Sequence, residues 1–295
     1  MEMDTKKLDR EAAQVAMRFM GIFAWKTVLL ASVLFFAYGA ILVAAATGQM
    51  GLMAAFALQS VVVYAVYTVL HEAVHGNVAG NGNGFQWLNS LAGHVSGWIL
   101  LIPFKVHKAE HFAHHRSTND SDVDPDHVFA ARGPVDVFFK SLRTVAIQYS
   151  FYFRNVWPKA STGERVSVLA DVTMMLGGRV LLAAFGFPLE VLVLTVLANI
   201  VGNYITVVFF AWLVHHPHSE TGRYVDTAVY VFPKWLDGAI TWLWLFQNYH
   251  AIHHLFPRVP FYEYKKVFSE IRPIMVERGA PIREVGKSPQ TFVAA

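Results

Sequence analysis

Four stretches of the chain stay apolar for roughly twenty residues, which is the length that an α-helix needs to cross a lipid bilayer. The third is the weakest of them because it contains Asp171 and Arg179. Short turns separate the first stretch from the second and the third from the fourth, so we expect two helical hairpins. The predicted spans cover residues of about 27–46, 51–70, 168–187 and 189–214.

The lysine and arginine residues avoid the two short turns and concentrate elsewhere. Five lie at or before Lys26, nine lie between Lys105 and Arg165, and nine lie at or beyond Arg223. The remaining one, Arg179, falls inside the third predicted span. Because basic residues accumulate in cytoplasmic loops, we expect a multi-pass protein with both termini and the long middle segment in the cytosol.

The composition agrees with a membrane location. Of the 295 residues, 55% are hydrophobic and 15% are charged, whereas soluble domains average about 25% charged residues. Cysteine is absent, which excludes disulfides, thiolate-bound metals and iron–sulfur clusters. No linker, repeat or basic nucleic-acid-binding block is present. We therefore predict one domain over 1–295 with an all-α fold, in which residues 71–167 and 215–295 form a cytosolic helical cap above the four spans.

Most of the fourteen histidines fall in clusters on the predicted cytosolic side. That side was predicted from the lysine and arginine residues alone, so the position of the histidines is independent support for it. The second span runs into a histidine pair four residues apart, a spacing that shares one helix face, and then into the helix-stopping pair Gly76-Asn77. Two further clusters have the spacing i, i+3, i+4, which also converges on one face. The clusters are His71 and His75; His111, His114 and His115; His250, His253 and His254; and His215, His216 and His218.

Histidine-rich sites without thiolates suit iron, copper, zinc or nickel, and about nine histidines exceed what a single ion can use. The pattern therefore predicts two metal ions, and redox chemistry on a lipid favours iron. Metal-bound imidazoles usually give their second N–H to a carboxylate or carbonyl. Glu72, Glu110 and Asp124 are the candidates for this supporting role, although the acidic run at 119–126 is equally compatible with a solvated turn.

At this point the motifs resemble the membrane fatty acid desaturase superfamily, whose three histidine boxes match 71–75, 111–115 and 250–254. The resemblance covers nearly the whole chain and implies two irons held by histidines alone, with no catalytic residue beyond the ligands. His215 fits the family's histidine after the fourth span, and His218 is a second possibility. The boxes imply the ligands His71, His75, His111, His114, His115, His250, His253 and His254.

Two stretches, 114–127 and 247–264, resemble the carotenoid ring hydroxylase branch. This resemblance implies O₂-dependent hydroxylation of a carotenoid β-ring. Acyl desaturases share the His253-His254-Leu255-Phe256-Pro257 run, so fatty acyl desaturation is the alternative. Glu72 stands where many relatives have Asp. Because the chain lacks the fused cytochrome b5 domain of some relatives, we expect a separate electron donor such as ferredoxin or cytochrome b5.

Two alternatives come from other classes of protein. His71-Glu72-Ala73-Val74-His75 is also an HExxH motif, in which the glutamate acts as general base of a zinc protease, but that interpretation leaves the other histidine clusters without a role. A metal transporter would place ionisable residues in several spans, whereas here the charges are Asp171 and Arg179 in the third span and Glu190 at the edge of the fourth. Metal content separates the protease, with one zinc, from the oxidoreductase, with two irons.

Overall fold

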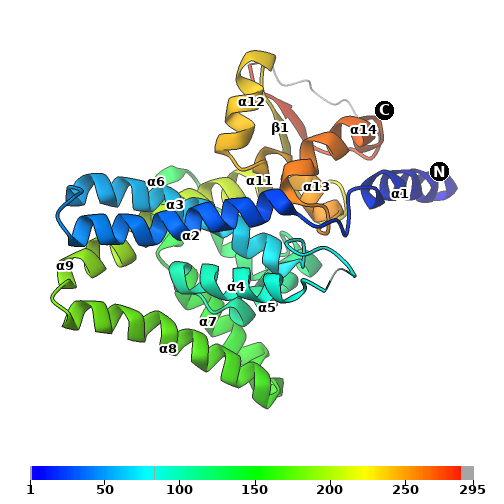
Figure 1. The fold of residues 1–295 in the computed structure, drawn as a ribbon. Helices are drawn as coiled ribbons and strands as arrows, with labels where there is room; N and C mark the ends of the chain where they lie inside the picture. The colour runs from blue at the N-terminus through cyan, green and yellow to red at the C-terminus, as the bar shows by residue number, and fades with distance from the viewer. Residues whose placement is uncertain (1, 83, 287–295) are drawn as a thin grey trace.

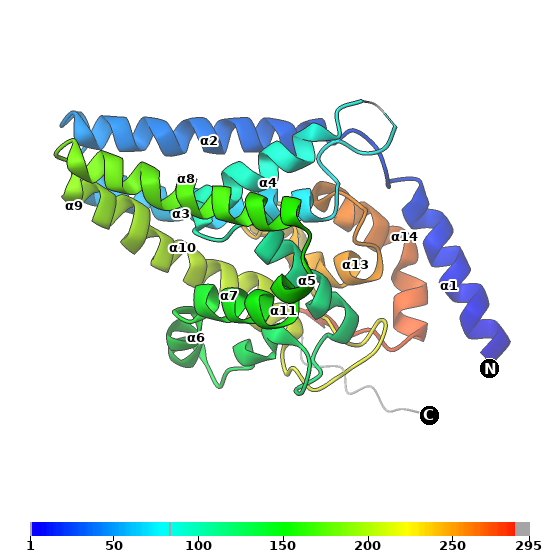
Figure 2. The ribbon, with the colours of Figure 1, turned by 90° about the horizontal axis from the view of Figure 1, so that it is seen from below.

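In the part of the chain that the structure describes, four helices are long and apolar enough to cross a membrane. The fold is described from a computed structural model over residues 2–82 and 84–286. Figures 1 and 2 show the four helices running lengthwise together, while most of the shorter helices gather toward one end of this set. The four are α2 (Trp25–Ala46), α3 (Leu52–Val74), α8 (Thr162–Ala184) and the continuous segment Pro188–His215.

The surfaces of these helices are apolar, as contact with lipid requires. Phe36 on α2 is 79% exposed and Val180 on α8 is 68% exposed. Large apolar side chains rarely form extended exposed patches on soluble proteins. By contrast, half of the most apolar window of α3 is buried, because α3 packs against α2, α4 and α10. The helix that begins the histidine clusters is thus the best enclosed of the four.

The segment Pro188–His215 is not a regular α-helix. It is divided into α9 (Pro188–Glu190), the π-helical η3 (Val191–Leu197), α10 (Ala198–Thr206), the π-helical η4 (Val207–Trp212) and α11 (Leu213–His215). A π turn holds more residues than an α turn, so it rotates the side chains that follow. The apolar sequence of this span gives no sign of either π segment.

The remaining helices are mostly short and follow one another closely. They are α1 (Glu2–Met17), α4 (Trp87–Leu100), α5 (Phe104–Ser117), α6 (Pro134–Ser141), α7 (Thr144–Asn155), α12 (Lys234–Leu243), α13 (His250–Leu255) and α14 (Tyr264–Glu277). Single 3₁₀ turns are η1 (Pro125–Phe129), η2 (Trp157–Lys159), η5 (Gln247–Tyr249) and η6 (Phe261–Glu263).

The predominantly helical fold agrees with the sequence, but one small sheet was not predicted. Strand β1 (Val229–Val231) pairs in parallel with β2 (Ile282–Glu284), and Val229 is opposite Ile282. β-branched and aromatic residues favour strands, but three residues are too few for an alternating pattern to be recognised. The partner strand lies about fifty residues away, so only the folded chain reveals the pairing.

Helix α8 begins six residues before the predicted span. Ser161 and Glu164 form a capping box: the Ser161 hydroxyl accepts the Glu164 backbone N–H, and the Glu164 carboxylate accepts the Ser161 backbone N–H. Such a box satisfies two backbone donors at a helix start. Its polar first turn lies outside the apolar stretch, which is why hydropathy alone placed the boundary too late.

Helices α3 and α10 approach closely at Gly202. A Cβ atom on Gly202 would lie 2.5 Å from Cγ1 of Val63 and 2.8 Å from the carbonyl oxygen of Ser60. Small residues allow membrane helices to pack this closely. At Gly177 on α8, by contrast, an added Cβ would meet nothing within 4 Å.

We therefore expect Gly202→Ala to destabilise the protein and Gly177→Ala not to do so. In a helix, alanine is intrinsically favoured over glycine by about 1 kcal/mol, but overpacking costs roughly 1–3 kcal/mol and should outweigh it at Gly202. Thermal unfolding of the detergent-solubilised variants measures the difference. Equal melting temperatures for the two variants would show that the α3–α10 contact is looser than described.

Candidate metal centre

Four elements bring the histidine clusters to one place. His71 lies on the last turn of α3, and His75 caps the end of that helix, where Gly76 adopts a positive φ of 73°. The Gly-Asn stop predicted from the sequence is therefore confirmed. Helix α5 carries the second cluster near its C-terminal end, α13 carries the third, and α11 ends at His215.

Five of the rings form one group, which we call the five-histidine cluster. Its members are His71, His75, His111, His115 and His253, whose nearest ring nitrogens all lie within 4.8 Å of one another. Nε2 of His111 is 2.9 Å from Nε2 of His75, and Nε2 of His115 is 2.8 Å from Nε2 of His253. The contacts join α3, α5 and α13.

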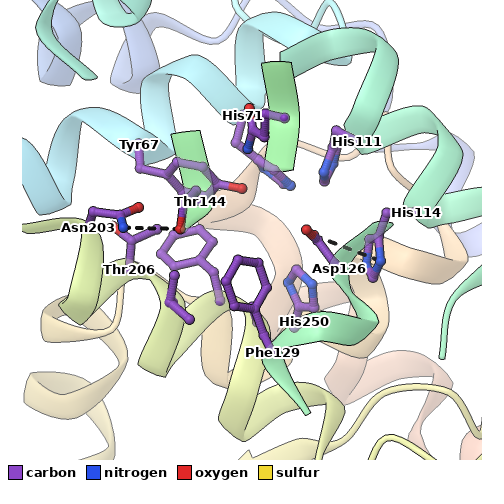
Figure 3. A pocket seen from close by; sticks show the side chains of 14 residues that line it. Tyr67, His71, His111, His114, Asp126, Phe129, Thr144, Asn203, Thr206 and His250 are labelled. Atoms are coloured by element: carbon purple, nitrogen blue, oxygen red, sulfur yellow. Dashed lines mark hydrogen bonds and ion pairs between the residues drawn. The ribbon is translucent and has the colours of Figure 1, made fainter. Parts of the chain in front are cut away.

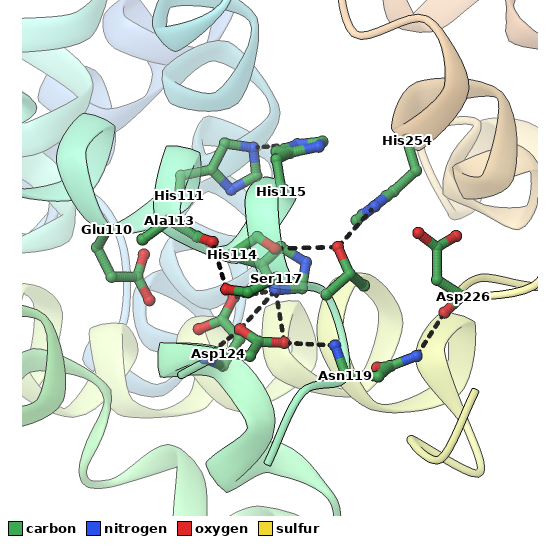
Figure 4. A network of polar contacts seen from close by, with 12 residues as sticks. Glu110, His111, Ala113, His114, His115, Ser117, Asn119, Asp124, Asp226 and His254 are labelled. Carbon is green, nitrogen blue, oxygen red and sulfur yellow. Dashed lines mark hydrogen bonds and ion pairs between the residues drawn. The ribbon is translucent and has the colours of Figure 1, made fainter. Parts of the chain in front are cut away.

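A second group, the three-histidine cluster, consists of His114, His215 and His254 and meets the same 4.8 Å criterion. His250 adjoins it, because its Nε2 is 3.1 Å from Nε2 of His254. The two clusters lie side by side, since the rings of His115 and His254 stack with centroids 4.4 Å apart. Figure 4 shows His111, His114 and His115 on α5 facing His254.

The ring nitrogens are better placed to bind metal ions than to hydrogen-bond to one another. A neutral imidazole has one N–H and one lone pair, yet Nε2 of His115 lies within 3.0 Å of the Nε2 atoms of both His111 and His253. Both ring nitrogens of His71 are buried without a hydrogen-bond partner among the described residues. Two imidazole nitrogens bound at right angles to one ion, each at about 2.1 Å, are themselves about 3.0 Å apart. A shared cation would therefore satisfy these nitrogens.

The environment keeps most of the rings neutral, as metal ligation requires. Burial, and secondarily the neighbouring histidines, lower the pKa of His111, His115 and His254 well below its ordinary value. His114 differs. Burial by itself would lower its pKa, but the hydrogen bond to Asp124 and the nearby carboxylates outweigh burial and raise it.

Asp124 orients His114 (Figure 4). Its carboxylate accepts from His114 Nδ1 at 2.9 Å, from the Asn119 backbone N–H at 2.8 Å and from the Asp126 backbone N–H at 2.9 Å. Because the carboxylate accepts, Nδ1 of His114 carries a proton, and Nε2 is the ring nitrogen that is left for a metal ion. This is the supporting contact that metal-bound histidines usually have.

Two further side chains contact the outer nitrogens of cluster histidines and were not predicted from the sequence. The Gln247 side-chain carbonyl lies 2.7 Å from Nδ1 of His250, and the Tyr264 hydroxyl lies 3.0 Å from Nδ1 of His253. In both cases the second ring nitrogen is held and Nε2 faces the centre. Gln247 precedes His250 by three residues and could have been suspected from the 3₁₀ spacing, whereas Tyr264 reaches His253 only through the packing of α14 on α13.

Three of the residues predicted for the site, His218, Glu72 and Glu110, do not belong to either histidine cluster. The Nε2–H of His218 donates to the carbonyl oxygen of Trp212, and its ring centroid is 6.1 Å from that of His215, so it belongs to neither cluster. The carboxylate of Glu72 accepts from the side chain of Asn77 and from the backbone N–H of Phe261.

Glu110 is buried at 3.8 Å from Nδ1 of His107. Burial and the nearby Asp126 raise the pKa of Glu110 well above its usual range. In the described part of the chain neither Glu72 nor Glu110 hydrogen-bonds to a cluster histidine. Helical spacing alone does not reveal whether a carboxylate on the same helix reaches a ring nitrogen.

A small cavity lies against the rings (Figure 3). Its volume is about 30 Å³, and its lining includes His71, His111, His114, His250 and Asp126. One water needs about 10–15 Å³ of such volume, so the cavity admits about two molecules of that size.

The sequence model of the family described as "Fatty acid desaturase" matches residues 50–286, which include every histidine of both clusters. The chain belongs to the fatty acid desaturase family. The resemblance stated from the histidine boxes is thus confirmed at the level of the family.

As a member of the fatty acid desaturase family, the chain has curated relatives at low identity. It is 26% identical over 264 residues to the chloroplastic omega-3 fatty acid desaturase of Brassica napus, a match covering 78% of this chain and 62% of the relative. It is 24% identical to the sn-1 oleoyl-lipid 12-desaturase of Anabaena variabilis, over 70% of this chain and 64% of the relative. It is 23% identical to the fatty acid conjugase FAC2 B of Calendula officinalis, over 74% and 66%. The chain thus spans less than two thirds of the length of these relatives.

Proposed function

We propose that this protein is an integral membrane oxidoreductase that holds two iron ions and uses O₂ to oxidise a lipid. The observation that carries the proposal is the pair of adjoining histidine clusters at the ends of candidate membrane helices. The five-histidine cluster would hold one ion, and the three-histidine cluster with His250 would hold the other. When bound, the iron pair supplies the activation of O₂ needed to oxidise an unactivated carbon.

The chain's own residues contribute position, protonation state and exclusion of water. Burial keeps the rings of His111 and His253 neutral, so that each offers a lone pair. Asp124, Gln247 and Tyr264 hold the outer ring nitrogens and so fix the direction of the inner ones. The burial of His71, His111 and His253 keeps these ligand positions away from bulk water.

The proposed topology places both termini and the histidine clusters in the cytosol, with two hairpins in the bilayer below a cap formed by the rest of a single domain. Its support is the distribution of lysine and arginine together with the span lengths. An independent electron donor, ferredoxin or cytochrome b5, completes the reaction. One relative, from Arabidopsis thaliana, is named an "sn-2 acyl-lipid omega-3 desaturase (ferredoxin)".

For the substrate we propose a carotenoid that is hydroxylated on its β-ring, on the basis of the two stretches that resemble the ring hydroxylase branch. Fatty acyl desaturation is the second candidate, and the names of the relatives favour it, because they include desaturases and a conjugase. The choice depends on which carbon the protein holds near the clusters.

Expression in a host that supplies both β-carotene and fatty acids separates the two candidates. We expect hydroxylated carotenoids and an unchanged fatty acid profile, both measured by liquid chromatography and mass spectrometry against a His111→Ala control. Unchanged carotenes with newly unsaturated fatty acids would replace the hydroxylase proposal by the desaturase one. If neither profile changes in an iron-loaded protein supplied with donor, both substrate proposals are wrong.

The zinc protease alternative finds no support in the geometry. A general base must reach the metal-bound water, but Glu72 is bound to Asn77 and Phe261 at the end of α3. His71 and His75 instead share one cluster with three other histidines. Metal analysis of the purified protein tests this directly, because the protease requires one zinc per chain and the proposal requires two irons.

A further inference from the structure

The two charged residues in the apolar part of α8, Asp171 and Arg179, have no role in the proposed chemistry, and they do not bind each other. Instead, each reaches the segment 98–104, which runs from the last turn of α4 to the first residue of α5 and which we call the α4–α5 corner. Asp171 is 2% exposed. Its Oδ2 accepts from the backbone N–H of Phe104 at 3.2 Å, and its Oδ1 accepts from Trp98 Nε1 at 2.8 Å and contacts His94 Nδ1 at 2.7 Å.

Arg179 binds the other side of the same corner. Its two terminal nitrogens donate to the carbonyl oxygens of Trp98 and Ile99, at 3.2 and 3.4 Å. Its Nε donates to the hydroxyl of Thr195 at 3.1 Å. The Asn199 side chain adds a second donor to the Ile99 carbonyl at 2.7 Å. The carbonyls at the end of α4 therefore find side-chain donors from two other helices.

The signs of the two charges match the helix ends that they contact. Phe104 is the first residue of α5, and helix N-termini carry partial positive charge and unpaired N–H groups. Trp98 and Ile99 lie in the last turn of α4, where partial negative charge and unpaired carbonyls accumulate. These helix ends pack against the candidate span α8, where they have little access to water, so protein donors and acceptors must satisfy them.

The corner is also closely packed. A Cβ on Gly93 would lie 2.5 Å from the Phe104 ring, and a Cβ on Gly97 would lie 2.5 Å from the carbonyl oxygen of Ile102. Leu101 turns the chain with a φ of 62°. Because these contacts leave no free space between the atoms, a shift of the corner would also move the start of α5.

Helix α5 is only fourteen residues long and supplies three histidines to the two clusters. We propose that Asp171 and Arg179 are positioning residues that fix the α4–α5 corner, so that α5 presents His111, His114 and His115 to both clusters. They act through the backbone of the corner and have no contact with the rings of the clusters. The part of this inference that concerns iron rests on the proposed function, whereas the part that concerns the corner does not.

Asp171→Leu tests the first contact. Leucine has a similar size and suits a membrane helix, but it removes every acceptor that faces Phe104, Trp98 and His94. Thr173→Leu is the matched control, because Thr173 is exposed on the same helix and its hydroxyl donates to its own helix at Leu169. We measure amide hydrogen–deuterium exchange over residues 100–111 and iron per folded chain, by plasma mass spectrometry, in the monodisperse fraction.

For Asp171→Leu we expect exchange at the start of α5 to be at least tenfold faster and iron per chain to fall to less than half, with Thr173→Leu unchanged in both. Unchanged exchange would overturn the proposal, and so would faster exchange with full iron content. If the wild-type protein itself binds no iron, the proposed function fails, and the exchange measurement alone then decides whether the corner is fixed as described.

Arg179 provides a second route in case Asp171→Leu does not fold. Arg179→Met removes the guanidinium donors to the carbonyls of Trp98 and Ile99 and leaves Asn199 as the side-chain donor to Ile99, whereas Arg179→Lys keeps a cation that can reach one of these carbonyls. Exchange over 100–104 and loss of iron should rank Arg179→Met above Arg179→Lys, and Arg179→Lys above the wild type. Equal behaviour of Met, Lys and wild-type proteins would show that the guanidinium does not hold the corner.

Discussion

Replacing His111 by alanine is expected to reduce bound iron from about two ions per chain to one or fewer and to abolish product formation. His111 contacts two other members of the five-histidine cluster, with its Nε2 2.9 Å from that of His75 and 3.0 Å from that of His115. It is also buried, so its removal leaves a vacant ligand position away from bulk solvent. The loss should be larger than that caused by removing a supporting group outside the clusters, which typically costs 10–100-fold.

The same outcome is expected for His115→Ala and His254→Ala, which remove one ligand from each cluster. His216→Ala is the matched control, because His216 is next to His215 in the sequence but is exposed and belongs to neither cluster. Metal analysis and product analysis on the same preparations provide the measurement. Two irons and normal turnover in all three cluster variants would refute the assignment of these ligands.

Asp124→Asn should weaken metal binding roughly 10–100-fold without removing any ligand, as is typical when a metal-bound histidine loses its carboxylate partner. The carboxylate accepts three hydrogen bonds, from His114 and from two backbone N–H groups. An amide presents an N–H₂ group to one of these donors, so one bond is lost and His114 is less firmly held in its Nδ1–H form.

Competition with a chelator, followed as iron lost per chain against chelator concentration, measures this effect. The expected change is greater loss from the three-histidine cluster, to which His114 belongs, with the five-histidine cluster less affected. Asp122→Asn is the control, since Asp122 is exposed two residues away. A chelator curve for Asp124→Asn identical to that of Asp122→Asn would show that the carboxylate does not support the site.

Much of the molecule is determined by local patterns in the chain. The four apolar stretches predict the membrane helices, because a span needs roughly twenty apolar residues in a row. Each stretch meets this requirement through its own local sequence. The spacings around His71, His111 and His250 predict which rings share a helix face, because the helical period is fixed. The Gly76-Asn77 stop and the family resemblance follow from the same short segments.

The grouping of the rings could not be obtained in this way. His114 and His115 are adjacent on α5 but belong to different clusters. His253 groups with histidines of α3 and α5, whereas His254 groups with His114 of α5 and His215 of α11. Whether His218 reached a cluster depended on the path of the chain after α11. These outcomes depend on the angles at which helices far apart in the sequence pack, and no local period encodes those angles.

The sequence alone thus establishes a membrane protein of the fatty acid desaturase family with histidines in defined boxes. Only the tertiary structure decides how the boxes divide into two clusters, that Tyr264 and Gln247 support them, and that the charges of α8 bind the α4–α5 corner. Asp171 and Arg179 illustrate the physical reason. A charge in an apolar stretch signals that a partner must exist, since burying it unpaired is too costly, but the partner here is a helix end some seventy to eighty residues earlier in the chain.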